Sequence, residues 1–275
     1  MAAPPAPASE LDRLWARLRV VTPARIGLAR AGAAISTRET LAFQAAQARA
    51  RDAVAAPFDA DGLETGIAAR SLTPLRLQSR AGDLTAYLAR PDLGRALDDP
   101  SRARLAAAPK GFDLVFVLAD GLSPQATRKH ALPLIDAALP TLVGDGWRVG
   151  PVAIVERGRV ASGDEIGAGL EARLVAVLVG ERPGLTTPDS LGVYLTWAPR
   201  AGRSDAERNC LSNVRPEGLL YAEAARRFVL LCRAARRLKL TGVGLKDESE
   251  AAPAVLGPAA TRASTGSAQT SPRSA

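Results

Sequence analysis

The chain has 275 residues, of which 47% are hydrophobic, so it can bury a sizeable core in one large or two small domains. Its formal net charge of +8 comes from 32 arginines and only 4 lysines scattered through an alanine-rich chain, while aromatic residues make up just 4%. Because aromatic side chains do not interleave with the basic ones, we do not expect nucleic-acid binding.

Membrane insertion and secretion are not expected either. No stretch approaches the roughly 18 consecutive apolar residues of a membrane-spanning helix, and the N-terminal MAAPPAPASE lacks the basic start and apolar middle of a signal peptide. The two cysteines, Cys210 and Cys232, are too few for a disulfide framework and match neither a zinc nor a redox spacing. These observations predict a soluble, cytoplasmic protein without a structural metal.

The first part of the chain predicts a mainly helical region over residues 9–110, preceded by a flexible segment of residues 1–8. Ser9 is a suitable N-cap for a first helix, which ends at Thr22-Pro23. The apolar residues of this helix recur at helical spacing: Leu11, Leu14, Trp15, Leu18 and Val21. Such an amphipathic helix needs a partner surface.

The rest of this region mixes loop, helix and strand signals. PARIGLARAG is expected to be an ordered loop, and the pair Ser36 and Glu39 forms a capping-box pattern before a second helix. LTPLRLQS alternates apolar and polar residues, as a half-buried strand does, and a turn follows at Pro91. Residues 99–111 are the best candidate for a seam with the following region.

From Phe112 the pattern changes to apolar runs separated by helical stretches. The runs are FDLVFVLADGL, VGPVAIVERGRV, RLVAVLVGERPG and LGVYLTWAPR, and a long helix with an apolar stripe covers residues 218–240. Uniformly apolar strands between helices predict an α/β fold, with a doubly wound, mainly parallel, Rossmann-like sheet over residues 111–247. Residues 248–275 have the composition of a disordered tail.

Polar clusters follow three of the predicted strands. They are Asp120-Gly121, residues 156–160 and residues 180–184. The carboxyl ends of parallel strands form a crevice where ligands bind, and the glycines of these clusters allow the backbone to approach a ligand closely. The alternative is an ordinary polar turn in which Glu181 and Arg182 are simply solvated.

No catalytic constellation is complete in this chain. Its one histidine, His130, has no evident metal or triad partner and is better explained by packing or surface exposure. Ser123 is better explained as a helix cap than as a nucleophile. No glycine-rich phosphate-binding sequence follows any strand. We therefore expect no catalytic residues here, and a binding module rather than a self-sufficient enzyme.

Several blocks of the sequence, in order, resemble the small, or light, subunit of ethanolamine ammonia-lyase. They include TPARIGLARAG, YLARPDLGRAL, LVFVLADGLSPQA, VERGRVASGDEIG, LVGERPGLTTPDSLGVYLTWAPR and DAERNCLSNVRPEGL, and the similarity runs from Leu11 to Lys246. The resemblance implies a hetero-oligomer with a large subunit that uses adenosylcobalamin to convert ethanolamine to acetaldehyde and ammonia. It also implies that the large subunit holds ethanolamine, while the small subunit helps to hold the cobalamin.

The resemblance assigns three cofactor-binding residues to this chain: Val160, Glu181 and Cys210. We expect their role to be geometric, with Val160 packing against the lower base of the coenzyme and Glu181 accepting hydrogen bonds from its amide or ribose groups. Arg159 and Arg182 are further candidates for the nucleotide phosphate. An arbitrary free cysteine is usually a small buried packing residue, which remains the interpretation of Cys232 and the alternative for Cys210.

Two questions stay open at this point. The alternative function is that of a non-catalytic regulatory α/β protein, which would bind a nucleotide or small ligand in the same crevice without a lyase partner. The resemblance is also compatible with a location either in the free cytoplasm or in a bacterial microcompartment.

Overall fold

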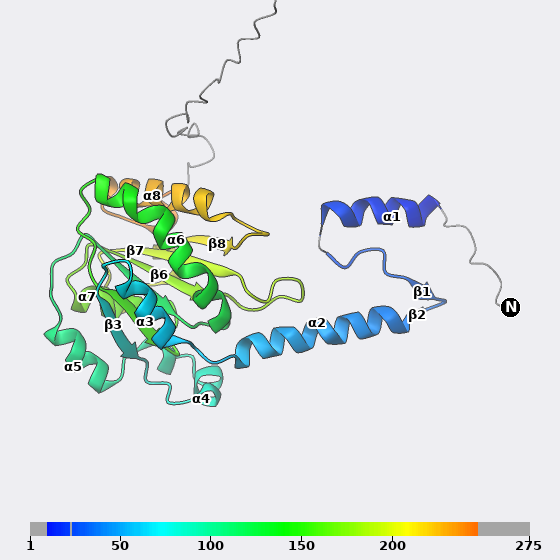
Figure 1. The fold of residues 1–275 in the computed structure, drawn as a ribbon, viewed down its shortest axis with the longest axis horizontal. Coiled ribbons are helices and arrows are strands. Elements are labelled where there is room, and N and C mark those ends of the chain that lie inside the picture. The colour runs from blue at the N-terminus through cyan, green and yellow to red at the C-terminus, as the bar shows by residue number, and fades with distance from the viewer. Residues whose placement is uncertain (1–9, 23, 247–275) are drawn as a thin grey trace, which may run out of the picture.

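A computed structural model describes residues 10–22 and 24–246 of the chain (Figure 1). The expected flexible segment 1–8, the expected cap Ser9, Pro23 and the expected tail 248–275 lie outside the described residues. In the described part, no helix is long and apolar enough to cross a membrane.

A six-stranded sheet forms the centre of the molecule, in the order β3-β5-β4-β6-β7-β8. The strands are β3 (Pro74–Gln78), β4 (Leu114–Ala119), β5 (Val152–Glu156), β6 (Leu174–Gly180), β7 (Leu191–Trp197) and β8 (Asn209–Val214). The first four in spatial order run parallel, whereas β7 is antiparallel to both β6 and β8. The predicted α/β fold with a mainly parallel sheet is confirmed, with β7 and β8 as an antiparallel addition.

Helices cover both faces of this sheet. One face packs against α3 (Ala60–Ala68), α6 (Pro124–Gly144) and α8 (Tyr221–Leu238), and the other against α5 (Asp99–Ala107) and α7 (Ser162–Gly169). Alternate residues of β4 serve the two layers, since Phe116 contributes to the first core and Val117 to the second. Every residue of β4 and β6 is therefore buried, which explains their uninterrupted apolar sequences.

The N-terminal residues form an arm that extends from this body (Figure 1). It consists of α1 (Glu10–Val21), a small hairpin of β1 (Arg30–Ala31) and β2 (Ala34–Ile35), and α2 (Thr37–Ala55). Both predicted helices are confirmed, whereas the last part of the segment expected to be a loop forms β1 of the hairpin. The side chain of Ser36 caps α2 by accepting a hydrogen bond from the backbone N–H of Glu39, at 3.4 Å. The Glu39 carboxylate lies 3.7 Å from Arg25, so the capping box is only half formed.

Between the arm and the second half, the structure contains more than helices. The predicted strand is present as β3, and it pairs in parallel with β5 at one edge of the sheet. The short helix α4 (Leu84–Ala89) ends just before the predicted turn at Pro91, and the expected seam 99–111 contains α5. The domain boundary at residue 110 stays a prediction, although β3 on its N-terminal side belongs to the central sheet.

A buried ion pair joins α7 to the antiparallel end of the sheet. The guanidinium of Arg208, which precedes β8, donates two hydrogen bonds to the carboxylate of Asp164, at 2.7 and 2.6 Å. It also donates to Thr196 Oγ1 of β7 at 2.8 Å. The side chains of Arg208 and Asp164 are only 2% and 4% exposed, so neither charge can be solvated by water if the other is lost.

Replacing Asp164 with Asn should therefore lower the free energy of unfolding by about 3–5 kcal/mol, because the buried Arg208 charge then keeps only its 3.4 Å contact with Asp205, whose side chain is 92% exposed. Urea unfolding followed by circular dichroism measures this loss. The control is Asp99→Asn, which removes one partner of an ion pair to Arg102 in which the Asp99 side chain is 94% exposed. A loss for Asp164→Asn no larger than that of the control would contradict this role.

Candidate functional site

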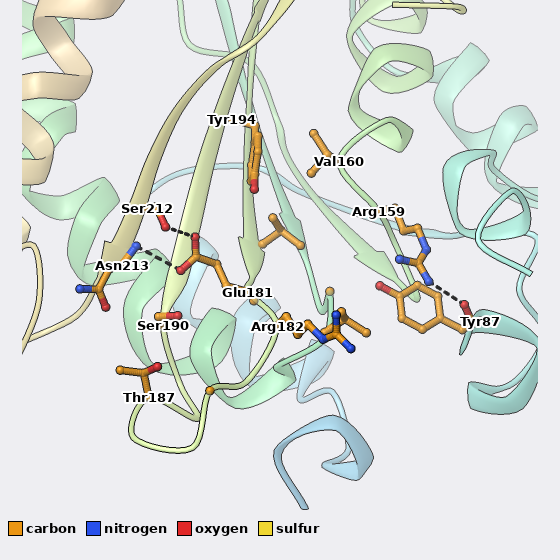
Figure 2. Close-up of a pocket in the computed structure, with 15 residues that line it drawn as sticks. Tyr87, Arg159, Val160, Glu181, Arg182, Thr187, Ser190, Tyr194, Ser212 and Asn213 are labelled. Carbon is orange, nitrogen blue, oxygen red and sulfur yellow. Dashed lines mark hydrogen bonds between the residues drawn. The ribbon is translucent and has the colours of Figure 1, made fainter. Parts of the chain in front are cut away.

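A crevice opens at the carboxyl ends of β4, β5 and β6, where the sequence predicts a ligand. Its volume is about 610 Å³, and Figure 2 shows how its side chains lie. They come from α4, from the turns after the three strands, and from β7 and β8. The lining residues are Tyr87, Gly121, Leu122, Arg159, Val160, Val179, Gly180, Glu181, Arg182, Gly184, Thr187, Ser190, Tyr194, Ser212 and Asn213.

Two glycines bring the turn after β4 against the end of β6. Gly121 has a φ of +61°, and a Cβ there would lie 2.3 Å from the carbonyl oxygen of Gly180. A Cβ on Gly180 would lie 2.1 Å from the carbonyl oxygen of Ser123. The N–H of Leu122 donates to the carbonyl of Gly180 at 3.0 Å. Since only glycine fits at both positions, the floor of the crevice is fixed by backbone packing.

Asp120 ties the turn after β4 to the turn after β5. Its carboxylate accepts hydrogen bonds from the backbone N–H groups of Gly121, Arg157 and Gly158, at 3.0, 2.7 and 2.9 Å. Burial raises the pKa of Asp120 to about 7, while these three hydrogen bonds oppose the rise. Asp120 therefore holds the loop that carries Arg159 and Val160 without facing the crevice as a charged ligand.

Glu181 follows β6 and is held over the antiparallel end of the sheet (Figure 2). Its carboxylate accepts hydrogen bonds from the hydroxyl of Ser212 and from the backbone N–H of Asn213, the latter at 3.1 Å. These donors sit on a β-bulge of β8, opposite Gly192. A Cβ on Gly192 would lie 3.1 Å from Glu181, so the absence of a side chain there makes room for the carboxylate.

Arg159 lies at the other side of the crevice, against Tyr87 of α4. Its guanidinium stacks over the Tyr87 ring, 4.4 Å from the centroid, and donates to the Tyr87 carbonyl at 2.9 Å. The Nε atom of Arg159 is buried and has no hydrogen-bond partner within the described part of the chain. This side chain is therefore fixed in place, whereas Arg182 is exposed.

Cys210 lies on β8 and does not line the crevice itself. It pairs with Tyr194 in the β7–β8 register, and Tyr194 does line the crevice. Desolvation by neighbouring atoms raises the pKa of the Cys210 thiol, a hydrogen bond with Tyr194 opposes the rise, and the negative charge of Glu181 adds to it. The thiol is thus neutral at physiological pH.

Val160 and Glu181 both line the crevice. Cys210 does not line it, but is paired with Tyr194, which does. Ser123 occupies the N-cap position of α6, but the predicted cap hydrogen bond is absent, because its hydroxyl donates to the carbonyl of Pro188 at 2.9 Å. His130 is buried, with Nδ1 2.7 Å from the Tyr221 hydroxyl. Cys232 is fully buried in the core, as expected.

Comparison with known proteins agrees with the resemblance noted in the sequence. The profile of the family described as ethanolamine ammonia-lyase light chain matches residues 12–246. The chain belongs to this family. It is 54% identical over 242 residues to the ethanolamine ammonia-lyase small subunit of Azotobacter vinelandii, which covers 86% of this chain and 90% of that protein. It is 52% identical over 248 residues to the small subunit of Ralstonia nicotianae, covering 89% and 92%.

Membership of the light-chain family confirms the expected class, a subunit of a carbon–nitrogen lyase. The name of these relatives implies that each works with a larger subunit. Within residues 10–22 and 24–246, no three His, Cys, Asp or Glu side chains are grouped as a metal site would require.

Sequence reasoning missed four residues that shape the crevice: Tyr87, Tyr194, Ser212 and Asn213. The two on β8 were missed because the strand itself was not predicted, since NCLSNV buries only Leu211 and Val214. Tyr87 lies within the block YLARPDLGRAL and Tyr194 within LGVYLTWAPR. A tyrosine interrupting an apolar strand was the available signal for Tyr194, because its hydroxyl needs a polar edge.

The raised pKa of Asp120 makes stability depend on pH. The unfolded carboxyl loses its proton near pH 4 and the folded one near pH 7, so between these values the folded state binds more protons. The stability that Asp120 contributes should therefore fall as pH rises from 4 to 7, by about 1.4 kcal/mol per pH unit at most, and be constant above.

Unfolding by urea between pH 4.5 and 8 measures this, with Asp120→Asn as a variant that does not titrate. Other groups titrate alike in both proteins, so their effect cancels in the difference. A stability difference between the two that stays constant over this range would disprove the raised pKa.

Proposed function

We propose that this chain holds adenosylcobalamin together with a large-subunit partner, for the conversion of ethanolamine to acetaldehyde and ammonia. The observation that carries the proposal is the Glu181 carboxylate, held at a strand-end crevice by Ser212 and Asn213. A carboxylate offers about four acceptor positions, and two are used here. The remaining positions can accept hydrogen bonds from the amide side chains of the coenzyme.

The crevice fits such a ligand in size and chemistry. Pockets of about 300–1,000 Å³ enclose a drug-sized molecule, so a crevice of about 610 Å³ covers only part of the much larger cobalamin and leaves the rest for a partner. Its lining combines apolar surface from Val160 and Val179 with polar groups from Ser190 and Glu181. The buried, unpartnered Nε of Arg159 supports a polar ligand or bound water at that side.

In this proposal the side chains orient the coenzyme and exclude water. The coenzyme, when bound, supplies the radical chemistry through its cobalt–carbon bond. Val160 is half-buried and offers apolar contact to the lower base, while exposed Arg182 is free to approach the nucleotide phosphate. Cys210, with its neutral thiol, acts as a small contact residue through Tyr194 or its backbone, and not as a thiolate ligand of cobalt.

The open crevice has a direct consequence for activity. Because the described residues surround only one side of it, the chain alone should not convert ethanolamine and should bind adenosylcobalamin weakly. Turnover is measured as acetaldehyde formed by the purified chain, with the complex containing the large subunit as the positive control. Turnover by the chain alone would refute the proposed division of labour.

The contribution of Glu181 is tested in the complex. Glu181→Ala should weaken coenzyme binding by about 1–3 kcal/mol, or roughly 5- to 150-fold, because cofactor donors lose their acceptor. Spectroscopic titration with adenosylcobalamin measures the affinity. Glu171→Ala is the matched control, since Glu171 is exposed and precedes the amino end of β6, whereas Glu181 follows the carboxyl end of the same strand. Unchanged affinity for Glu181→Ala would return Glu181 to a solvated turn residue.

The regulatory alternative is separated from this proposal by co-purification. A light-chain family member that works in the lyase must form a stable complex with the co-expressed large subunit, whereas a free-standing ligand-binding protein does not. Cell fractionation distinguishes the free cytoplasm from a microcompartment as the location of the complex.

A further inference from the structure

Helix α1 carries an apolar stripe that nothing in the described part of the chain covers. The stripe consists of Leu11, Leu14, Leu18 and Val21, which are 58%, 48%, 37% and 79% exposed. Their spacing of three, four and three residues places them on one side of the helix. No residue of α1 is buried, and in α2 only Ala46 and Ala53 are. Residues 10–22 and 24–246 therefore leave this stripe open to a partner.

The arm is nevertheless internally braced and not a loose extension. Arg19 of α1 donates to the carbonyl groups of Ile26 and Gly27 in the following loop. Trp15 packs directly on Gly27, where a Cβ would lie 2.4 Å from the indole ring. Arg25 donates to the carbonyl of Glu39 in α2 at 2.9 Å. A surface held in shape before binding loses less conformational entropy when a partner docks.

Exposed apolar residues are concentrated on this arm. Of the 16 large hydrophobic residues that are exposed in the described chain, eight lie between residues 11 and 43. Besides the stripe, they are Val20, Ile35, Leu41 and Phe43. The four residues of the stripe share one side of α1, and an exposed apolar surface on one helix side is typical of an interaction site.

The charge of the arm argues against a second copy of this chain as the partner. Residues 10–55 contain eight arginines and four acidic residues, a net charge of +4. Two such arms would repel each other, and a contact between two 12-residue helices is too small for the 1,200–2,000 Å² of a typical stable interface. A partner that complements this arm would offer an apolar groove flanked by carboxylates.

The position of the arm indicates which partner this is. The arm and the loop that follows β6 extend to the same side of the sheet (Figure 1), and that loop carries Glu181 and Arg182 at the open crevice. A protein that closes the crevice therefore meets the arm as well. The large subunit of the proposed function is such a protein.

We infer that the arm of residues 10–55 docks on the large subunit through the stripe of α1, with its arginines facing acidic groups at the rim. This inference rests on the proposed function and adds the surface by which the complex forms. Because the arm leads into the body at α3, its docking also sets how closely the crevice approaches the large subunit.

The test compares two variants of α1 in the full-length chain. Leu14→Asp places a charge in the stripe, and Ala16→Asp places the same charge on the opposite, exposed side of the helix. Since α1 contributes nothing to the buried core, both variants should unfold at the wild-type temperature. Binding to the purified cognate large subunit should be weakened at least about tenfold by Leu14→Asp and little changed by Ala16→Asp. Leu18→Ser provides a second, uncharged change of the stripe with the same expected direction.

Each other outcome has a distinct meaning. Wild-type affinity in both stripe variants, or equal weakening by Ala16→Asp, would overturn docking through the stripe. A wild-type chain that sediments as a dimer alone, and as a monomer with Leu14→Asp, would show that a second copy covers the stripe, again overturning the inference. If the wild-type chain fails to bind the large subunit at all, the proposed function fails, and not merely the docking surface.

Discussion

The buried ion pair between Arg208 and Asp164 is the interaction on which the crevice depends. It fixes the start of β8 to α7, so that β8 can continue the sheet beyond β7 and present its bulge beside the end of β6. Glu181 owes its two hydrogen-bond donors to that bulge. A buried pair of this kind is weak evidence for stability compared with apolar packing, yet it specifies position well. The same pair thus links a structural constraint to the proposed ligand contact.

Among the described residues, the crevice contains groups that can bind a ligand but no pair of groups arranged for proton transfer. Two charged groups beside it are committed to structure, since Asp120 is bound to three backbone N–H groups and Arg159 is stacked on Tyr87, whereas Arg182 is exposed. Glu181 alone offers a carboxylate with unused acceptor positions. Such an arrangement can hold and orient a large ligand, but it provides no pair of groups poised to give and take protons. The arrangement is thus compatible with the proposed division, in which this chain binds and the partner carries out the chemistry.

The sequence predicted the parallel part of the fold well and the antiparallel part poorly. β4 and β6 are buried on both faces, so their uniform apolar runs were clear signals. β7 was expected among parallel strands, but only about ten residues separate it from β6, and a parallel connection needs a crossover of a dozen or more. The bulge that holds Glu181 could not be foreseen, because it depends on pairing between a strand that was predicted and one, β8, that was not.

The stripe of α1 and the crevice are both surfaces that the described residues of this chain leave uncovered. Exposed apolar residues on α1 carry a cost in water, and an open crevice loses the benefit of low dielectric for its polar contacts. In the proposed complex, one docking event would bury the apolar residues of α1 and would also strengthen the polar contacts of the crevice. Formation of the complex and retention of the ligand would then be thermodynamically linked. By this linkage, a ligand held between the two subunits tightens their association as much as their association tightens the ligand. The braced arm would then act on the crevice without touching it.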